Sequence, residues 1–228
     1  SGNTVNATVT AKDTYGNQLT TGGLTVTMYN SGGSSTITFG SVTDNSNGTY
    51  NSVLTGVTSG TATQIGAKFS GANLTSTLPT LLVNPGGISI SQSIVSVSTS
   101  GIASGATDTL TLTAKDSSGN LITSGGQVIV FSRSGGGSTG NISGTTDNNN
   151  GTYTASFVAV LAGSSTTISA TINGSTVTST LPTITVSPGA ISLSQSLVTV
   201  SSATLASGTG VTVTLTAKDP NGNSISTG

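Results

Sequence analysis

One eight-residue motif occurs three times in this chain at a fixed step of 103 residues. Its copies are TAKDTYGN (Thr10–Asn17), TAKDSSGN (Thr113–Asn120) and TAKDPNGN (Thr216–Asn223). The same step relates Gly48–Tyr50 to Gly151–Tyr153 without an insertion or deletion. A constant period predicts a tandem array, in which function is repeated along the chain rather than concentrated in one pocket.

Each repeat is long enough to be a domain, because about 100 residues can bury a core of their own. The repeat frame divides the chain into three parts. They are residues 1–87, an immunoglobulin-like repeat lacking its first strand; residues 88–190, a complete repeat; and residues 191–228, the first strands of a third repeat. We therefore expect a tandem array of separate domains, with both ends resembling cuts through a longer array.

Composition excludes several classes of protein. Charged residues make up 5% of the chain and the formal net charge is -1, so the chain lacks the positive charge with which proteins bind nucleic acid. There is no Cys, which excludes disulfides and thiolate metal sites. No apolar run approaches the roughly 20 residues of a membrane span, so we expect none in this segment. Long Thr-rich, Cys-free arrays of this kind are typical of secreted bacterial and archaeal surface proteins.

Apolar residues alternate with Thr and Ser throughout the complete repeat, which predicts strands. We expect a first strand from Ile88 to about Ser98 that passes between sheets through a bulge. A seventh strand, Thr176 to Val186, contains Pro182 and so belongs at an edge or bulge. About seven short strands predict an all-β fold of tandem immunoglobulin-like β-sandwich domains. The inward-facing set of the intervening strands is Leu110, Leu112, Ala114, Ile129, Phe131, Tyr153, Ala155, Phe157, Ile168, Ala170 and Ile172.

Each copy resembles the bacterial immunoglobulin-like repeat of the invasin and intimin type. The family pattern runs from Thr-x-Lys-Asp-x-x-Gly-Asn, through a Thr-Asp turn that ends in Gly, to a Gly-x-x-x-x-Ile-x-Ala strand. The segments Thr113–Asn120, Thr146–Thr152 and Gly163–Ala170 match it in order. These motifs consist of turn and core positions, so the resemblance specifies a fold more than an activity.

The resemblance implies a structural stalk or fibre segment of a cell-surface adhesin or extracellular filament. Its partners would be neighbouring repeats of the same chain, further copies in a self-associated fibre, and a host or cell-surface ligand held by a tip domain. The competing interpretations are a glycan- or receptor-binding module and a phage surface or tail domain. Recognition loops need aromatic or Arg anchors, yet Tyr15 and Tyr29 of the first copy become Ser118 and Ser132 in the second.

Groups that support catalysis are scarce, because the chain has no His, Cys, Glu or Trp. The one conceivable pair is Lys115 with Asp116. The alternation that buries Ala114 points Lys115 outward, which predicts a solvated lysine beside an Asx-turn aspartate and argues against an isopeptide crosslink. The sequence therefore predicts no enzyme and no catalytic residue.

Calcium is the one cofactor that the sequence leaves open, because several loops rich in Asp and Asn fall at one pole of the predicted sandwich. Carboxylate and amide oxygens are ligands that calcium prefers. Each loop carries one carboxylate, however, which favours the competing interpretation of Asp and Asn that cap turns through their own backbone. The candidate ligands are Asp116, Asn120, Asp147, Asn148 and Asn173.

The linker Val186–Ala190 is short and contains the pair Pro188-Gly189. The linker one repeat earlier, Val83–Gly87, contains Pro85-Gly86 in the same place. A Pro-Gly pair favours a defined turn over a flexible tether. We therefore expect consecutive repeats to hold a preferred angle.

Overall fold

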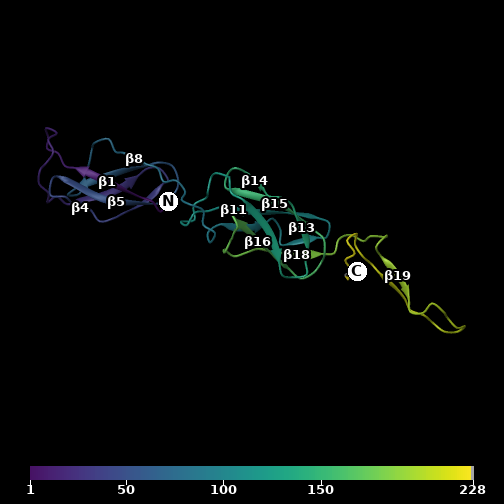
Figure 1. The fold of residues 1–228 in the computed structure, drawn as a ribbon. Helices are drawn as coiled ribbons and strands as arrows, with labels where there is room; N and C mark the ends of the chain where they lie inside the picture. Colours follow the sequence, from purple (N-terminus) through teal and green to yellow (C-terminus); the bar gives the residue numbers. More distant parts are fainter. Residues whose placement is uncertain (227–228) are drawn as a thin grey trace. The chain divides into compact units, whose positions relative to one another are not determined.

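The computed structural model describes residues 1–226; residues 227–228, at the end of the predicted third repeat, lie outside the described part. Every regular element of the described residues is a β-strand (Figure 1). Within that range, no helix is long and apolar enough to cross a membrane. The predicted all-β class is confirmed.

The strands fall into two compact units. The first contains Ser1–Gln92 together with the loop Lys115–Thr123, and the second contains Ser93–Ala114 and Ser124–Gly228. The loop Lys115–Thr123 thus packs with the unit of the first repeat, although the sequence frame assigns it to the second. The repeat boundaries at residues 87 and 190 stay sequence predictions.

The first unit has two antiparallel sheets. One has the strand order β1-β5-β3, with β4 also paired to β5, and the other has the order β2-β6-β7, with β8 paired to β6. Buried Tyr50, Leu54 and Ala67 lie in the core that the two sheets enclose. The strands are β1 (Thr4–Thr10), β2 (Val26–Ser31), β3 (Thr36–Phe39), β4 (Thr43–Asp44), β5 (Thr49–Thr58), β6 (Thr63–Phe69), β7 (Ala72–Asn73) and β8 (Thr80–Leu81).

The second unit has a complete sandwich of two sheets and a separate two-stranded sheet. The sandwich sheets have the orders β13-β15-β11-β9, with β14 beside β15, and β10-β18-β16-β12, with β17 beside β16; β19 pairs with β20. The strands are β9 (Ile94–Val97), β10 (Gly101–Ala103), β11 (Thr107–Thr113), β12 (Ile129–Ser134), β13 (Gly140–Ile142), β14 (Thr146–Asp147), β15 (Thr152–Ala159), β16 (Thr166–Ile172), β17 (Ser175–Thr176), β18 (Thr183–Ser187), β19 (Leu197–Val200) and β20 (Val213–Thr216).

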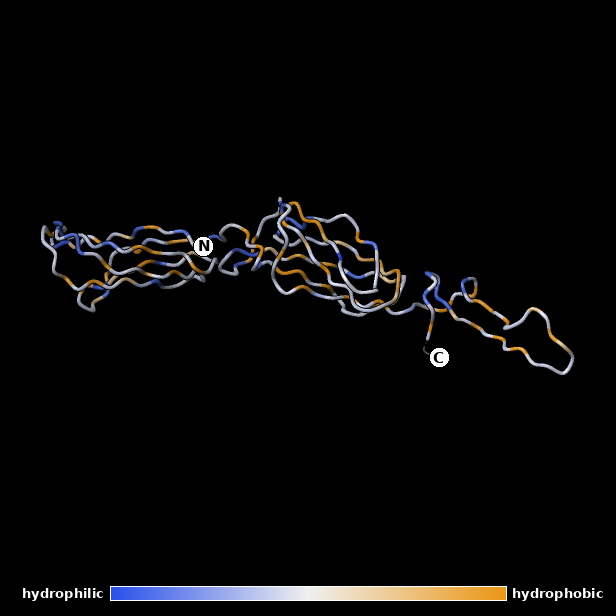
Figure 2. The backbone as a smooth tube through the Cα atoms, turned by 60° about the horizontal axis from the view of Figure 1, so that its bottom comes forward, coloured by the Kyte–Doolittle hydropathy of each residue, from blue (hydrophilic) through white to orange (hydrophobic). Residues whose placement is uncertain are grey.

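The core of this sandwich consists of the residues that the period-two pattern places inward. Along β16 every second residue is buried, and along β15 the buried positions are Tyr153, Ala155, Phe157 and Ala159. Figure 2 shows short hydrophobic and more polar stretches following one another along the backbone. All eleven residues of the predicted inward set are buried, which confirms that prediction.

The first strand begins later than the sequence predicted. Ile88 forms only an isolated bridge with Asp116, and the regular strand β9 starts at Ile94. The change of sheet comes later than predicted, after Ser98 rather than within Ile88–Ser98: β9 pairs antiparallel with β11, and β10 (Gly101–Ala103) pairs parallel with β18. The predicted seventh strand is also interrupted, because Pro182 precedes β18 and only its carbonyl joins the sheet, accepting from Ile168 N–H at 2.9 Å.

Replacing Tyr153 with Ala should lower the free energy of unfolding by about 3–5 kcal/mol, because it removes a large, fully buried ring. Replacing it with Phe should cost only about 1 kcal/mol, because the ring stays and the lost contact is Gln127 N–H donating to the tyrosine hydroxyl at 3.2 Å. Urea unfolding of both variants measures the difference. Equal losses would show that packing of this ring does not hold the sandwich together.

Candidate functional site

Asp116 organises the turn that follows β11. Its Oδ1 accepts hydrogen bonds from Ser118 N–H and Asn120 N–H, both at 2.9 Å. Gly119 N–H donates to the Asp116 carbonyl at 3.0 Å, and Gly119 takes a φ of 82°, which favours glycine. The aspartate therefore forms an Asx turn, as the residue types predicted.

The second carboxylate oxygen of Asp116 accepts from two groups outside the turn and one within it. Gly86 N–H donates to Oδ2 at 2.8 Å and Ser1 Oγ at 2.6 Å, while Asn120 Nδ2, from the turn, donates at 3.0 Å. The Asp116 side chain is 0% exposed. A buried carboxylate is costly unless hydrogen bonds replace water, and here both oxygens have several donors.

Asn120 extends the same network to the end of β5. Its Nδ2 donates to Val57 O at 2.9 Å, and its Oδ1 accepts from Ser59 N–H at 3.0 Å. We call Asp116 and Asn120, with their backbone partners Val57, Ser59 and Gly86, the Asp–Asn lock. All five residues lie in the first compact unit. In the sequence frame, the two side chains belong to the second repeat and their partners to the first.

The same arrangement recurs 103 residues later, within the second compact unit. Asp219 Oδ2 accepts from Gly189 N–H at 2.9 Å. Asn223 Nδ2 donates to Val160 O at 2.8 Å, and Asn223 Oδ1 accepts from Ala162 N–H at 2.8 Å. Asp219 is 0% exposed and Asn223 is 8% exposed. The motif therefore makes equivalent contacts at both of its later copies.

The first copy shows what the motif does by itself. Asp13 Oδ1 accepts from Tyr15 N–H at 2.9 Å and from Asn17 N–H at 2.8 Å, and Asn17 Nδ2 donates to Asp13 Oδ2 at 3.0 Å. Both residues are exposed. The turn thus forms without outside partners, so the burial of the later copies comes from the residues against which they pack.

Hydrogen bonding controls the charge state of the buried pair. Burial raises the pKa of Asp116, but hydrogen bonds from Ser1, Gly86 and Asn120 outweigh it and hold that pKa well below its ordinary value. Burial also raises the pKa of Asp219, but hydrogen bonds from Gly189 and Asn223 outweigh this effect and lower the pKa to about 2. Both aspartates are therefore charged acceptors at neutral pH.

The other candidate calcium ligands are bound to nearby protein groups. Asp147 accepts from Gly126 N–H at 2.6 Å and from Asn149 N–H at 2.8 Å. Asn148 Nδ2 donates to Thr152 Oγ1 at 3.0 Å. Asn173 accepts from Val128 N–H at 3.0 Å. Asp147 and Asn173 thus both anchor residues 126–128. Asp116 and Asn120 instead bond to Gly86, Val57 and Ser59.

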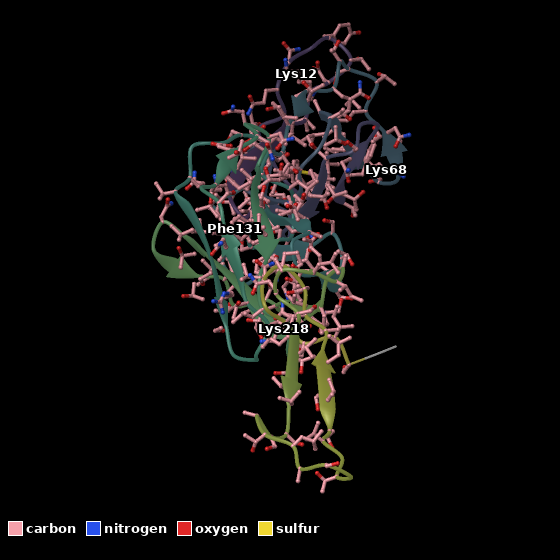
Figure 3. The ribbon with its side chains drawn as sticks, turned by 90° about the vertical axis from the view of Figure 1, so that its right-hand side faces the viewer. Lys12, Lys68, Phe131 and Lys218 are labelled. Atoms are coloured by element: carbon pink, nitrogen blue, oxygen red, sulfur yellow. The ribbon has the colours of Figure 1, made fainter. Side chains whose placement is uncertain are left out.

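Among residues 1–226, no three His, Cys, Asp or Glu side chains come together as a metal-binding group. Binding of calcium to the five candidate residues stays a prediction. The lysines beside the motif aspartates differ in exposure: Lys12 is exposed, while Lys115 and Lys218 are half-buried. Figure 3 labels Lys12 and Lys218.

The two-sheet sandwich topology is that of an immunoglobulin-like domain. The family model of invasin domain 3 matches residues 2–83 and 89–189, and the chain belongs to this family. It is an invasin-type adhesin immunoglobulin-like chain, as the resemblance implied. Among proteins with curated descriptions, none matches the sequence significantly.

Solved structures agree with this assignment. FdeC, an Escherichia coli adhesin eliciting protection against urinary tract infections, is 27% identical, with a TM-score of 0.54 over 97% of this chain and 70% of that one. Yersinia pseudotuberculosis InvD is 28% identical, with a TM-score of 0.52 over 97% and 67%. Invasin, a bacterial integrin-binding protein, is 23% identical, with a TM-score of 0.50 over 98% and 48%, and shows the shared fold.

Sequence reasoning missed the role of Asn120. An Asx turn needs Asp116 and favours Gly119, but it does not need a fixed Asn at the next position. The recurrence of that Asn in all three copies was the available signal. Its backbone partners could not be identified, because Val57 and Ser59 carry no distinguishing side-chain pattern.

Replacing Asn120 with Ala should lower the free energy of unfolding of the first unit by about 1–3 kcal/mol, because Val57 O and Ser59 N–H lose buried partners. The matched control is Asn17→Ala, which removes the same side chain from an exposed turn and should cost clearly less. Thermal unfolding followed by circular dichroism compares them. Equal losses would mean that the lock contributes no stability beyond its turn.

Acid should weaken the lock. A carboxylate whose folded pKa is depressed stabilises the fold above its unfolded pKa of about 3.9, and this contribution is lost as pH falls through the folded pKa. For Asp219 the loss should fall between about pH 4 and pH 2. Asp219→Asn should be less stable at pH 7 and show a flatter pH dependence across this window. A variant with the wild-type slope would contradict the assignment.

Proposed function

We propose that this chain is a non-catalytic, extending segment of a bacterial cell-surface adhesin. At the second and third copies of the motif, the Asp–Asn lock ties the motif loop to residues that the sequence frame assigns to the repeat before it. One observation carries the proposal: the lock recurs at Asp116 with Asn120 and at Asp219 with Asn223, with equivalent backbone partners.

Directional bonds suit this role better than apolar contact alone. The Asn120 amide uses its donor and its acceptor on Val57 and Ser59, which fixes both the distance and the rotation of the loop. Hydrogen bonds to a charged acceptor such as Asp116 are each worth about 1.5–3 kcal/mol. A short Pro-Gly linker then has few conformations left to sample.

A structural role also fits the chemistry that the sequence carries. Without His, Cys or Glu, the chain has few candidates for a general base or an activated nucleophile beyond its six Asp. FdeC is described as an adhesin. Membership of this family supports a place outside the cell, on the bacterial surface, and the adhesive ligand would be held by another domain.

The lock works without calcium. The Asp116 oxygens already accept from backbone and side-chain donors, and a cation would have to displace them. Excess chelator should therefore leave the melting temperature unchanged. A drop of several degrees, reversed by added calcium, would make these residues metal ligands and contradict this part of the proposal.

Small-angle scattering of the full chain tests the extending role. The wild-type chain should keep one narrow distribution of dimensions, whereas Asn120→Ala with Asn223→Ala should broaden it towards shorter dimensions, because both locks are broken. The matched control, Asn17→Ala, should scatter like the wild type. Identical profiles for all three chains would overturn the role of the lock. Specific binding of the wild-type chain on a glycan array would instead favour a recognition module.

A further inference from the structure

The chain contains Asn-Gly pairs that the structure holds in different ways. They are Asn47-Gly48, Asn150-Gly151, Asn173-Gly174 and Asn221-Gly222. Such a pair can react without an enzyme, because the main-chain nitrogen of the glycine lies next to the side-chain amide of the asparagine and no Cβ shields it. Whether a pair reacts in the folded chain therefore depends on how three groups are held: the amide oxygen, the amide nitrogen and the glycine N–H.

The turn that joins β14 to β15 holds Asn150 by its amide oxygen (Figure 1). Asn150 Oδ1 accepts from Thr152 N–H at 3.0 Å and from Thr152 Oγ1 at 2.7 Å. Because a backbone N–H only donates, the first of these bonds identifies the oxygen of the side-chain amide. Asn148 Nδ2 donates to Thr152 Oγ1 at 3.0 Å, which leaves the hydroxyl proton for Asn150. Two donors thus converge on one carbonyl oxygen.

The turn that joins β4 to β5 in the first unit has the same arrangement. Asn47 Oδ1 accepts from Thr49 N–H at 3.1 Å and from Thr49 Oγ1 at 2.7 Å. Asn45 Nδ2 donates to Thr49 Oγ1 at 2.9 Å. Asn47 and Asn150 are both exposed, so water reaches both amides. We call residues 45–49 and 148–152 the Asn-Gly-Thr turns.

The groups that would react in these turns have no competing protein partners. Within residues 1–226, the N–H of Gly48 and of Gly151 donates to no protein acceptor, and neither does Nδ2 of Asn47 or of Asn150. The two glycines take φ angles of 78° and 80°, in the region that favours glycine. The nucleophile and the leaving group are therefore both accessible.

Asn173 is held at both ends of its side-chain amide. Its Nδ2 donates to Gln127 Oε1 at 2.7 Å, and its Oδ1 accepts from Val128 N–H at 3.0 Å. The nitrogen that would have to leave is thus bound to an acceptor from another loop.

Asn221 is held at its amide nitrogen, and the following glycine is held as well. Asn221 Nδ2 donates to Ser104 Oγ at 2.7 Å, and Gly222 N–H donates to Asp219 O at 3.0 Å. In this pair, hydrogen bonds occupy both the leaving group and the nucleophile.

We propose that Asn47 and Asn150 are sites of spontaneous deamidation. The main-chain nitrogen of Gly151 attacks Cγ of Asn150 and gives its proton to water, and negative charge develops on Oδ1, where both Thr152 donors stabilise it. The carbonyl forms again as Nδ2 takes a proton from water and leaves as ammonia, which closes a succinimide ring. Water then opens the ring at either carbonyl and gives aspartate or isoaspartate. Asn47 reacts in the same way with Gly48.

The reaction changes both the charge and the backbone of the turn. Each event adds one negative charge to a chain whose formal net charge is -1. Isoaspartate also lengthens the main chain by a methylene group, because the backbone then passes through the former side chain. Gly151 O follows this position directly and accepts from Ala114 N–H at 2.8 Å, so hydrogen exchange at Ala114 should become faster in the reacted chain.

Peptide mapping of the full chain by mass spectrometry tests the ranking of the four pairs. At mildly alkaline pH, Asn47 and Asn150 should lose their amides at least about tenfold faster than Asn173 and Asn221. In guanidinium chloride, where the hydrogen bonds are lost, the four rates should become similar. Enzymatic methylation of isoaspartate gives an independent measure of the product.

Variants at the hydroxyl donor separate its role from that of the turn. Thr152→Val keeps the backbone N–H and should slow deamidation of Asn150 about tenfold, while Asn47 in the same chain keeps its rate. Thr152→Ser should restore most of the rate, because it keeps the hydroxyl. The matched control is Thr154→Val, which makes the same change two residues further along β15 and should leave Asn150 unaffected.

Three results would overturn the proposal. Equal rates at the four pairs in the folded chain would show that the Asn-Gly-Thr turns do not select the site. A ranking that persists in guanidinium chloride would come from the sequence alone. Deamidation of Asn150 that is no slower in Thr152→Val than in the wild type would show that the hydroxyl does not stabilise the reacting oxygen.

Discussion

The carboxylate of Asp116 is the group on which the rest of this arrangement depends. It is buried and charged, so it is stable only where enough donors replace water. Its own turn supplies Ser118 and Asn120, and a segment earlier in the chain supplies Gly86. The turn forms even when exposed, as Asp13 shows, but the buried charge of Asp116 also has donors from outside the turn, Gly86 and Ser1. Burial of the aspartate and positioning of the loop are therefore one event.

The chain has few charged residues, and two of them serve the same structural role. Two of its aspartates, Asp116 and Asp219, occupy equivalent places in the two locks, while the sandwiches themselves rest on aliphatic and aromatic packing. The hydrophobic effect is non-directional: it depends on how much apolar surface is removed from water and does not set the orientation of the groups that pack together. Hydrogen bonds with defined donors and acceptors supply that direction.

Much of the fold was predictable because strand periodicity reports burial directly. Tyr153, Phe157 and Ile168 alternate with polar residues, and all three are buried. The start of the first strand was placed too early, because the apolar Ile88 and Ile90 resemble strand residues although Ile88 only bridges to Asp116. The function of Asn120 was missed for another reason. Its partners are backbone groups 61 and 63 residues away, and backbone groups leave no mark in a sequence.

Amide hydrogen exchange at Ser59 and Gly86 tests the central claim most directly. Neither residue lies in a strand, and their N–H groups donate to Asn120 Oδ1 and Asp116 Oδ2. If the lock holds the loop in solution, both amides exchange slowly in the wild-type chain, and Ser59 becomes fast in Asn120→Ala while the amides of β5 stay protected. Fast exchange at both positions in the wild-type chain would show that the lock does not form, and the account would be wrong.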